Sequence, residues 1–204
     1  MPPFIFNELD INTDDIADKV FRLQSHWISR SDEFPFYTLG RCSYLDGKTQ
    51  AYQDEIKVLN PILHKNFDSL YEKVIKKLSD QFNEPIVFSE RLAYPSFHIF
   101  ISHPFLLTHT GHWHQDYPHI TLGLKPVDPY TFTVAIKLPT GGGGMDYIED
   151  GIQRYLPYAE KEMIGHDGKV LHRIASLKEY VPYEYRITLQ GHLIRIDDVL
   201  TMFW

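Results

Sequence analysis

The stretch Gly111–Asp116 reads Gly-His-Trp-His-Gln-Asp and places a histidine, His114, two residues before a carboxylate, Asp116. Side chains alternate between the two faces of a β-strand, so residues i and i+2 point the same way. We therefore expect His114 and Asp116 to bind one metal ion from the edge of a single strand. A second histidine from elsewhere would complete a set of two His and one carboxylate, which suits non-haem Fe(II) and leaves coordination positions open.

A candidate third ligand and a candidate anion site follow downstream. His172 lies in an apolar, strand-like run shortly after a turn, and it is the candidate for the second histidine. Fourteen residues later the chain reads Arg186-Ile187-Thr188. Arg186 and Thr188 share a face of their expected strand. Since a guanidinium fork beside a hydroxyl is suited to binding a carboxylate, this pair predicts an anion-binding position.

The composition is that of an ordinary globular protein. The 204 residues are 43% hydrophobic and 23% charged, which is enough for one domain with a full core. A net charge of -7 gives no basic surface, so we expect no nucleic-acid partner. No apolar run has the length of a transmembrane helix and no signal peptide is evident, so we expect no membrane association. The single cysteine, Cys42, cannot form an internal disulfide, which fits a cytoplasmic location.

Residues 1–84 are expected to be a mostly helical support region. Thr13 is the expected N-cap of a first helix. A strand is expected over Phe36–Tyr44. Pro61 is expected to open the longest helix, because proline is favoured in the first helical turn. The apolar stripe of that helix, which runs from Leu63 to Phe82, predicts packing on a sheet.

Residues 85–204 change character and are expected to form the core that carries the metal site. Short apolar runs are separated there by Pro, Gly and His, namely Ile86–Ser89, Phe97–Ser102, Thr131–Leu138, Val170–Ile174 and Arg186–Ile196. This spacing is typical of an all-β sandwich or barrel. We therefore predict a single α+β, mainly β, domain over residues 1–204. Its jelly-roll core would carry the N-terminal helices packed on one sheet.

In their order, these motifs resemble the 2-oxoglutarate-dependent Fe(II) oxygenase superfamily. Members of that superfamily have a double-stranded β-helix (jelly-roll) core, an His-x-Asp motif, a distal His, and then an Arg that often belongs to an Arg-x-Ser/Thr pair. The chain carries these as His114-Gln115-Asp116, His172 and Arg186-Ile187-Thr188. Residues 131–138, followed by the glycine run 141–144, resemble the central strand and the turn after it. The resemblance covers roughly residues 86–196.

The resemblance implies an Fe(II)- and 2-oxoglutarate-dependent dioxygenase. His114, Asp116 and His172 would be the metal-binding and catalytic residues. Arg186, helped by Thr188, would bind the distal carboxylate of 2-oxoglutarate. With O2 as the other cosubstrate, the products would be succinate, CO2 and an oxidised small molecule. Because Asp116 is present, the chain keeps the carboxylate that halogenases of the superfamily replace.

Two more residues are candidate cosubstrate contacts. His98 lies on the strand expected to precede the metal strand, and Tyr94 stands just before that strand. The resemblance implies that polar side chains at such positions touch 2-oxoglutarate. The expected substrate is a small molecule, either amino-acid-like or natural-product-like. Hydroxylation is the default outcome, while desaturation, ring formation and epoxidation use the same kind of site.

Other assignments of these residues remain open. If His112 were the first ligand, it would stand four residues from Asp116 and lose the shared strand face. His192 could be the distal ligand with Arg195 as the carboxylate partner, although three residues leave little room for two binding tasks. The alternative functions are a cupin-like metalloenzyme, such as an isomerase or a 2-oxoglutarate-independent dioxygenase, and a non-catalytic jelly-roll binding module. The cupin-like enzyme would not need the Arg-x-Thr pair, and the binding module would not need an intact set of metal ligands.

Overall fold

The computed structural model describes residues 4–47, 49–108, 111–123 and 129–204. Its helices are α1 (Thr13–Arg22), the 3-10 turn η1 (Gln24–His26), α2 (Ser43–Asp46), α3 (Gln50–Phe82), the 3-10 turn η2 (Pro104–Leu107) and α4 (Pro118–Leu122). Its strands are β1 (Phe4–Glu8), β2 (Trp27–Ser29), β3 (Phe36–Leu39), β4 (Ile86–Phe88), β5 (Ser96–Ile101), β6 (Tyr130–Lys137), β7 (Met145–Glu149), β8 (Ile152–Leu156), β9 (Glu162–Asp167), β10 (His172–Ile174), β11 (Tyr185–Ile196) and β12 (Val199–Phe203).

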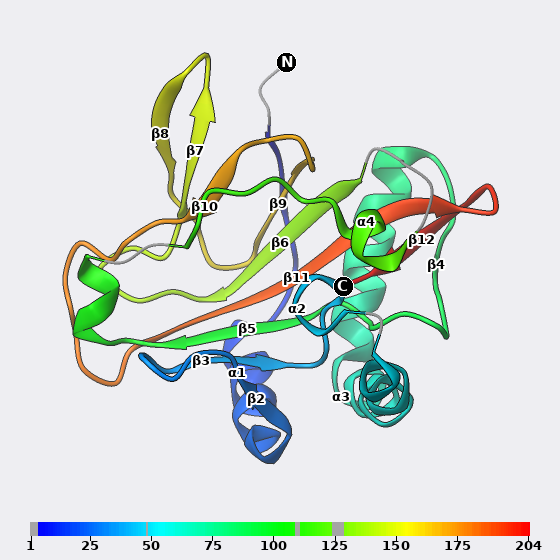
Figure 1. The fold of residues 1–204 in the computed structure, drawn as a ribbon, viewed down its shortest axis with the longest axis horizontal. Helices are drawn as coiled ribbons and strands as arrows, with labels where there is room; N and C mark the ends of the chain where they lie inside the picture. The colour runs from blue at the N-terminus through cyan, green and yellow to red at the C-terminus, as the bar shows by residue number, and fades with distance from the viewer. Residues whose placement is uncertain (1–3, 48, 109–110, 124–128) are drawn as a thin grey trace.

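The strands form a large sheet and a small sheet that packs over one end of it (Figure 1). The large sheet has the order β1-β9-β6-β11-β5-β3-β2, and β12 and β4 extend it beside β11. The small sheet has the order β10-β7-β8. Phe4 of β1, Ile164 of β9 and Met145 of β7 form a buried cluster between the two sheets. This two-layered, mostly antiparallel arrangement is the predicted jelly-roll core.

Helices α1 and α3 cover the outer face of the large sheet. Alternate residues of β11, from Ile187 to Leu193, join the main core together with Val20 of α1 and Val74 of α3. Strand side chains alternate, so the intervening residues of β11, Arg186 among them, point to the inner face. The helices therefore cover the apolar outer face of the sheet, while β11 presents polar side chains such as Arg186 and Thr188 on the inner face.

The long helix differs from the expectation that Pro61 opens it. Helix α3 begins at Gln50, and the hydroxyl of its N-cap Thr49 accepts a hydrogen bond from the Tyr52 N–H at 3.1 Å. Pro61 therefore lies inside the helix, and the prediction of its start is wrong. The tertiary packing of Tyr52 and Ile56, which are buried, keeps the preceding turns helical in spite of the proline.

The first helix and the first strand differ from expectation in detail. Helix α1 begins one residue earlier than predicted, because its N-cap is Asn12 and not Thr13; the Asn12 side-chain oxygen accepts hydrogen bonds from the N–H groups of Asp14 and Asp15. The strand expected over 36–44 ends at Leu39. At the next residue, Gly40, φ is +115°, and a Cβ there would lie 2.1 Å from the Ser96 hydroxyl oxygen. The chain turns at this glycine and forms α2 instead.

The other predicted runs correspond to β4, β5, β6, β10 and β11. The first 84 residues also supply β1, β2 and β3 to the large sheet, in addition to the helices. Within the described ranges, no helix is both long and apolar enough to cross a membrane.

Candidate metal centre

Backbone pairing brings the Gly111–Asp116 stretch beside β10. His114 and His172 form an antiparallel bridge in which each N–H donates to the other's carbonyl, at 3.0 and 2.9 Å. The Asp116 N–H donates to the carbonyl of Gly168 at 2.9 Å. Gly168 permits this approach, because a Cβ there would lie 2.5 Å from the Asp116 carbonyl oxygen. Residues 114–116 therefore pair with residues 168–172 as an additional short strand would, beside β10 of the small sheet.

This pairing places the three predicted ligands together. One possible ligand atom from each of His114, Asp116 and His172 lies within 4.8 Å of the other two. His114 Nε2 is 3.9 Å from Asp116 Oδ1, and His172 Nε2 is 3.7 Å from Asp116 Oδ2. The two-residue spacing therefore places the side chains of His114 and Asp116 on the same side of their extended segment. The backbone bridge between His114 and His172 brings the His172 side chain next to them.

Backbone carbonyls fix the tautomers of both histidines. His114 Nδ1 lies 2.7 Å from the His112 carbonyl, and His172 Nδ1 lies 2.9 Å from the Val170 carbonyl. A carbonyl oxygen can only accept, so each Nδ1 must carry the hydrogen and donate it. The lone pair of each ring is then on Nε2, which is the atom that faces Asp116. Such a second hydrogen bond is what orients a histidine for metal binding.

The protonation states also suit a cation. Burial lowers the pKa of His172 to about 4, although Asp116 opposes the shift, so the ring is neutral at pH 7. Burial alone would raise the pKa of Asp116, but His172 and three further histidines outweigh it and lower that pKa. At neutral pH the cluster therefore contains the neutral imidazole of His172 and the ionised carboxylate of Asp116.

The donor set fits a metal ion with open positions. Asp116 Oδ2 is buried and has no hydrogen-bond partner, which a buried carboxylate oxygen rarely tolerates unless something else satisfies it. The side chains of Asp116 and His172 are 14% and 10% exposed, whereas that of His114 is 48% exposed. A ligand reaching the centre would therefore approach from the His114 side.

His98 of β5 lies on the inner face of the large sheet, opposite Thr188 of β11. Its Nε2 is 2.7 Å from the hydroxyl of Tyr44 in α2, while its buried Nδ1 has no partner. Burial, followed by the charges of Arg186 and Arg30, lowers the pKa of His98 well below its usual range. Tyr44 is a residue that sequence reasoning missed, because α2 is distant in sequence from every motif.

Arg186 is buried on the same inner face and has no acidic partner. Arg186 is 4% exposed. Its Nε donates a hydrogen bond to the Gly143 carbonyl at 2.8 Å, and its Nη1 donates one to the Thr188 hydroxyl at 3.2 Å. Burial lowers the pKa of the guanidinium, which nevertheless stays charged at pH 7. No carboxylate of the described residues forms an ion pair with it. Glu184, two residues earlier, is bound to Thr140 instead.

The rival residues lie elsewhere. His192 is buried on the inner face and hydrogen-bonds the Thr131 hydroxyl through Nδ1 at 3.0 Å, so it neighbours the triad without joining it. Arg195 is exposed and pairs with Glu84. His112 contributes its carbonyl to His114.

The structure does not bring Tyr94 to this site. Its ring stacks on Phe88 of β4 at a centroid distance of 4.1 Å and contacts Tyr71 of α3. Tyr94 therefore belongs to the helix-covered side of the sheet. The physical reason is that it lies just before β5, where strand alternation does not yet apply.

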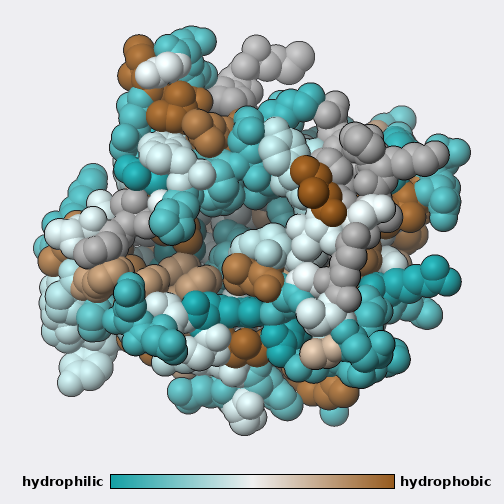
Figure 2. All heavy atoms as spheres, viewed as in Figure 1, coloured by the Kyte–Doolittle hydropathy of each residue, from teal (hydrophilic) through white to brown (hydrophobic). Residues whose placement is uncertain are grey.

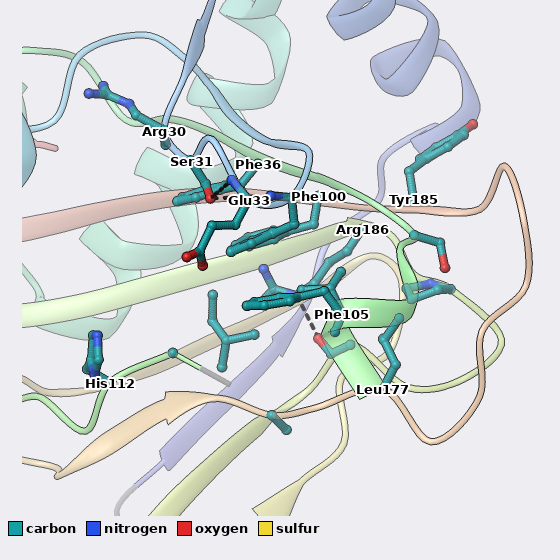
Figure 3. Close-up of a pocket in the computed structure, with 18 residues that line it drawn as sticks. Arg30, Ser31, Glu33, Phe36, Phe100, Phe105, His112, Leu177, Tyr185 and Arg186 are labelled. Atoms are coloured by element: carbon teal, nitrogen blue, oxygen red, sulfur yellow. Dashed lines mark hydrogen bonds between the residues drawn. The ribbon is translucent and has the colours of Figure 1, made fainter. Parts of the chain in front are cut away.

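A cavity of about 470 Å³ opens beside the centre (Figure 3). Arg186, Gly143 and His112 line it together with phenylalanine rings from the large sheet and from η2. Figure 2 shows the molecule hollowed near the middle of the face drawn in Figure 1. The volume lies within the range of roughly 300–1,000 Å³ that is typical of small-molecule sites.

Comparison with known proteins gives matches in structure alone. No family model matches the chain, and no curated protein matches its sequence. A novel N-substituted L-amino acid dioxygenase from Burkholderia ambifaria aligns with a TM-score of 0.62 at 13% identity, over 99% of this chain and 86% of that one.

Two further solved structures are similar. One is an oxidoreductase of the 2OG-Fe(II) oxygenase family from Burkholderia pseudomallei, with a TM-score of 0.55 at 10% identity over 92% of this chain and 82% of the other. The second is HygX from Streptomyces hygroscopicus with nickel and 2-oxoglutarate bound, with a TM-score of 0.54 at 8% identity over 93% and 82%. At these identities the likeness establishes the fold alone, and the predicted double-stranded β-helix (jelly-roll) core is confirmed.

Proposed function

We propose that the protein is a non-haem Fe(II)- and 2-oxoglutarate-dependent dioxygenase that oxidises, by default hydroxylates, an unactivated C–H bond of a small molecule. The observation that carries the proposal is the neighbourhood of two features. A His-Asp-His cluster lies at the small sheet, and a buried guanidinium that has no acidic partner among the described residues lines the cavity beside it. A buried charge without a counter-ion is costly, so Arg186 is expected to have an anionic ligand.

Two groups of residues would bind the metal and the cosubstrate. His114 and His172 would bind the metal through Nε2, and Asp116 would bind it through a carboxylate oxygen. Arg186 would pair with the distal carboxylate of 2-oxoglutarate, and the Thr188 hydroxyl holds the guanidinium in place at 3.2 Å. When bound, the metal and cosubstrate supply the oxidising power, with release of succinate and CO2.

Other residues would orient and shield the reactants. The unpartnered Nδ1 of His98 is available to a ligand on the inner face, and the Tyr44 hydroxyl holds the ring by its Nε2. Apolar walls around the cavity would exclude water from the reacting atoms. Two of the structurally similar proteins support this assignment by analogy, since one is described as an amino acid dioxygenase and another holds nickel and 2-oxoglutarate.

The test is an anaerobic titration with Fe(II) and then 2-oxoglutarate, read by the weak visible charge-transfer band of the chelate. Arg186→Ala should weaken 2-oxoglutarate binding by about 30-fold or more, because it removes the partner of a buried carboxylate. Arg195→Ala, a matched control at the exposed arginine, should leave binding unchanged.

Two results would contradict the proposal. If the wild-type protein binds Fe(II) but shows no band with 2-oxoglutarate, a cupin-like metalloenzyme is favoured instead. If Arg195→Ala weakens 2-oxoglutarate binding and Arg186→Ala does not, the cosubstrate anchor has been assigned to the wrong arginine.

A further inference from the structure

We propose that the cavity beside the triad selects a small substrate with a cationic nitrogen on an apolar, ring-sized body. This inference rests on the proposed function, because it takes Arg186 to be occupied by 2-oxoglutarate. It concerns the part of the cavity formed by the β2–β3 connection, by β5 and by η2.

The walls of this part are aromatic. The ring of Phe36 stacks on that of Phe100 at a centroid distance of 4.2 Å, and Phe34 stacks on Phe105 at 5.2 Å. All four rings line the cavity, and Figure 3 shows Phe36, Phe100 and Phe105 around it. Parallel aromatic faces favour a flat or compact apolar group, and they also attract a cation placed over a ring.

Once 2-oxoglutarate occupies Arg186, the charge left uncompensated in the cavity is negative. Arg30 lines the cavity, but both of its terminal nitrogens bind the Asp46 carboxylate, at 2.7 and 2.8 Å. Glu33 also lines it, and its carboxylate makes no hydrogen bond or ion pair with any described residue. With 2-oxoglutarate on Arg186, the unpaired charge available to a substrate is therefore the Glu33 carboxylate.

Glu33 is held over the cavity by its own loop. The Ser31 hydroxyl accepts from the N–H groups of Glu33 and Phe34, at 3.1 and 3.4 Å. The Arg30 N–H donates to the Phe36 carbonyl at 2.9 Å and closes the connection between β2 and β3. Figure 3 shows the Glu33 side chain directed into the cavity, toward the side where His112 lies. One short loop thus presents a carboxylate and an aromatic ring together.

A second observation points to a ligand in the same place. Ser102, directly after β5, lines the cavity and is 8% exposed, yet its hydroxyl oxygen has no hydrogen-bond partner. A buried hydroxyl without a partner is costly. A substrate that donates N–H groups would satisfy this oxygen, and an ammonium group has such donors to spare.

Three probes with one aromatic body and different head groups test the proposal: 2-phenylethylamine, 2-phenylethanol and 3-phenylpropanoate. Their binding is measured by calorimetry on anaerobic protein loaded with Fe(II) and saturating 2-oxoglutarate. The amine should bind about tenfold more tightly than the alcohol, and the carboxylate should bind most weakly. Glu33→Gln should remove the preference for the amine over the alcohol. Asp32→Asn, which changes the neighbouring carboxylate outside the cavity lining, should preserve it.

The proposal is overturned if the alcohol binds as tightly as the amine, or if Asp32→Asn abolishes the preference as Glu33→Gln does. It is also overturned if the charge-transfer band forms but none of the probes binds. The band is recorded in the same samples, so its absence reports failure of the proposed function. In that case the difference between the wild-type protein and Glu33→Gln in preference for the amine still reports on Glu33, because Arg186 is in the same state in both proteins.

Discussion

The surroundings of the Asp116 carboxylate suit the binding of a cation more than the stabilisation of the fold. Its carboxylate lies near two histidine Nε2 atoms at 3.7 and 3.9 Å, beyond hydrogen-bonding distance, and Oδ2 has no partner. The nearby Asp146 behaves differently, because its Oδ2 accepts from Arg173 Nε at 3.2 Å. The contrast between these two acidic residues gives a direct test of the metal centre.

Asp116→Asn should abolish tight metal binding and leave the metal-free protein as stable as before. Loss of a residue that only supports a ligand typically costs 10–100-fold in metal affinity, so loss of a ligand should cost more than about 100-fold. No side-chain hydrogen bond is lost, so the unfolding free energy should change by less than about 1 kcal/mol. Anaerobic Fe(II) titration and urea unfolding measure the two quantities. Asp146→Asn should show the reverse pattern, and an Asp116→Asn protein that still binds Fe(II) tightly would refute the assignment.

Tyr44→Phe should destabilise the protein through His98. The substitution removes the 2.7 Å hydrogen bond and leaves the buried His98 Nε2 without a partner. An unsatisfied buried polar group typically costs about 1–3 kcal/mol. Urea unfolding measures the loss, with Tyr183→Phe as control, since Tyr183 is 92% exposed. Equal stability of the two variants would show that His98 does not depend on Tyr44.

At the scale of secondary-structure elements, helix α3 begins at Gln50 and contains Pro61 in its interior. Pro61→Ala should stabilise the protein, because proline inside a helix costs about 3 kcal/mol while its removal returns roughly 0.4–1 kcal/mol of entropy to the unfolded chain. The expected net gain in unfolding free energy is about 2 kcal/mol. Lys65→Ala, an exposed change one turn later, should move stability by less than about 0.5 kcal/mol. A loss of stability in Pro61→Ala would mean that the ring itself packs usefully.

The same elements show what the sequence could and could not predict. Local rules sufficed to place the candidate ligands His114 and Asp116 on one side of an extended segment, and to place Arg186 and Thr188 on one face of their strand. They failed at Pro61, where buried neighbours override a favoured helix start. Strand β1 was not predicted, because its partner β9 lies more than 150 residues away in the chain. Pairing over such distances leaves no local signal.

Three residues that sequence reasoning missed illustrate the same limit. Glu33, Tyr44 and Ser102 belong to a loop, a short helix and a strand end, and each is ordinary within its own segment. Their relevance arises only when β3 pairs with β5 and brings these segments to one side of the inner face. Helices on the outer face and a cavity on the inner face are therefore properties of the whole molecule.

At the scale of the molecule, this arrangement predicts loss of stability at acidic pH. His98, His172 and His192 are buried on or beside the inner face, and burial lowers the pKa of each. Above the ordinary histidine pKa of 6.5 both folded and unfolded states are neutral, so these rings cause no pH dependence. Below it the unfolded chain binds protons that the folded protein does not, and stability falls. With a folded pKa of about 4, His172 alone accounts for about 3 kcal/mol.

Urea unfolding of chelator-treated protein between pH 7.5 and pH 4.5 should therefore show a steady decrease in unfolding free energy toward acid. Asp116 does not act in this window, because its lowered pKa means that its own contribution is lost only below about pH 3.8. His192→Gln should make the unfolding free energy depend less steeply on pH. The variant has one fewer histidine that is protonated in the unfolded chain but not in the folded protein. Saturating Fe(II) should steepen the loss, because protons compete with the metal for His172. Equal stability of the metal-free protein at both ends of the range would contradict the neutral, buried state of these histidines.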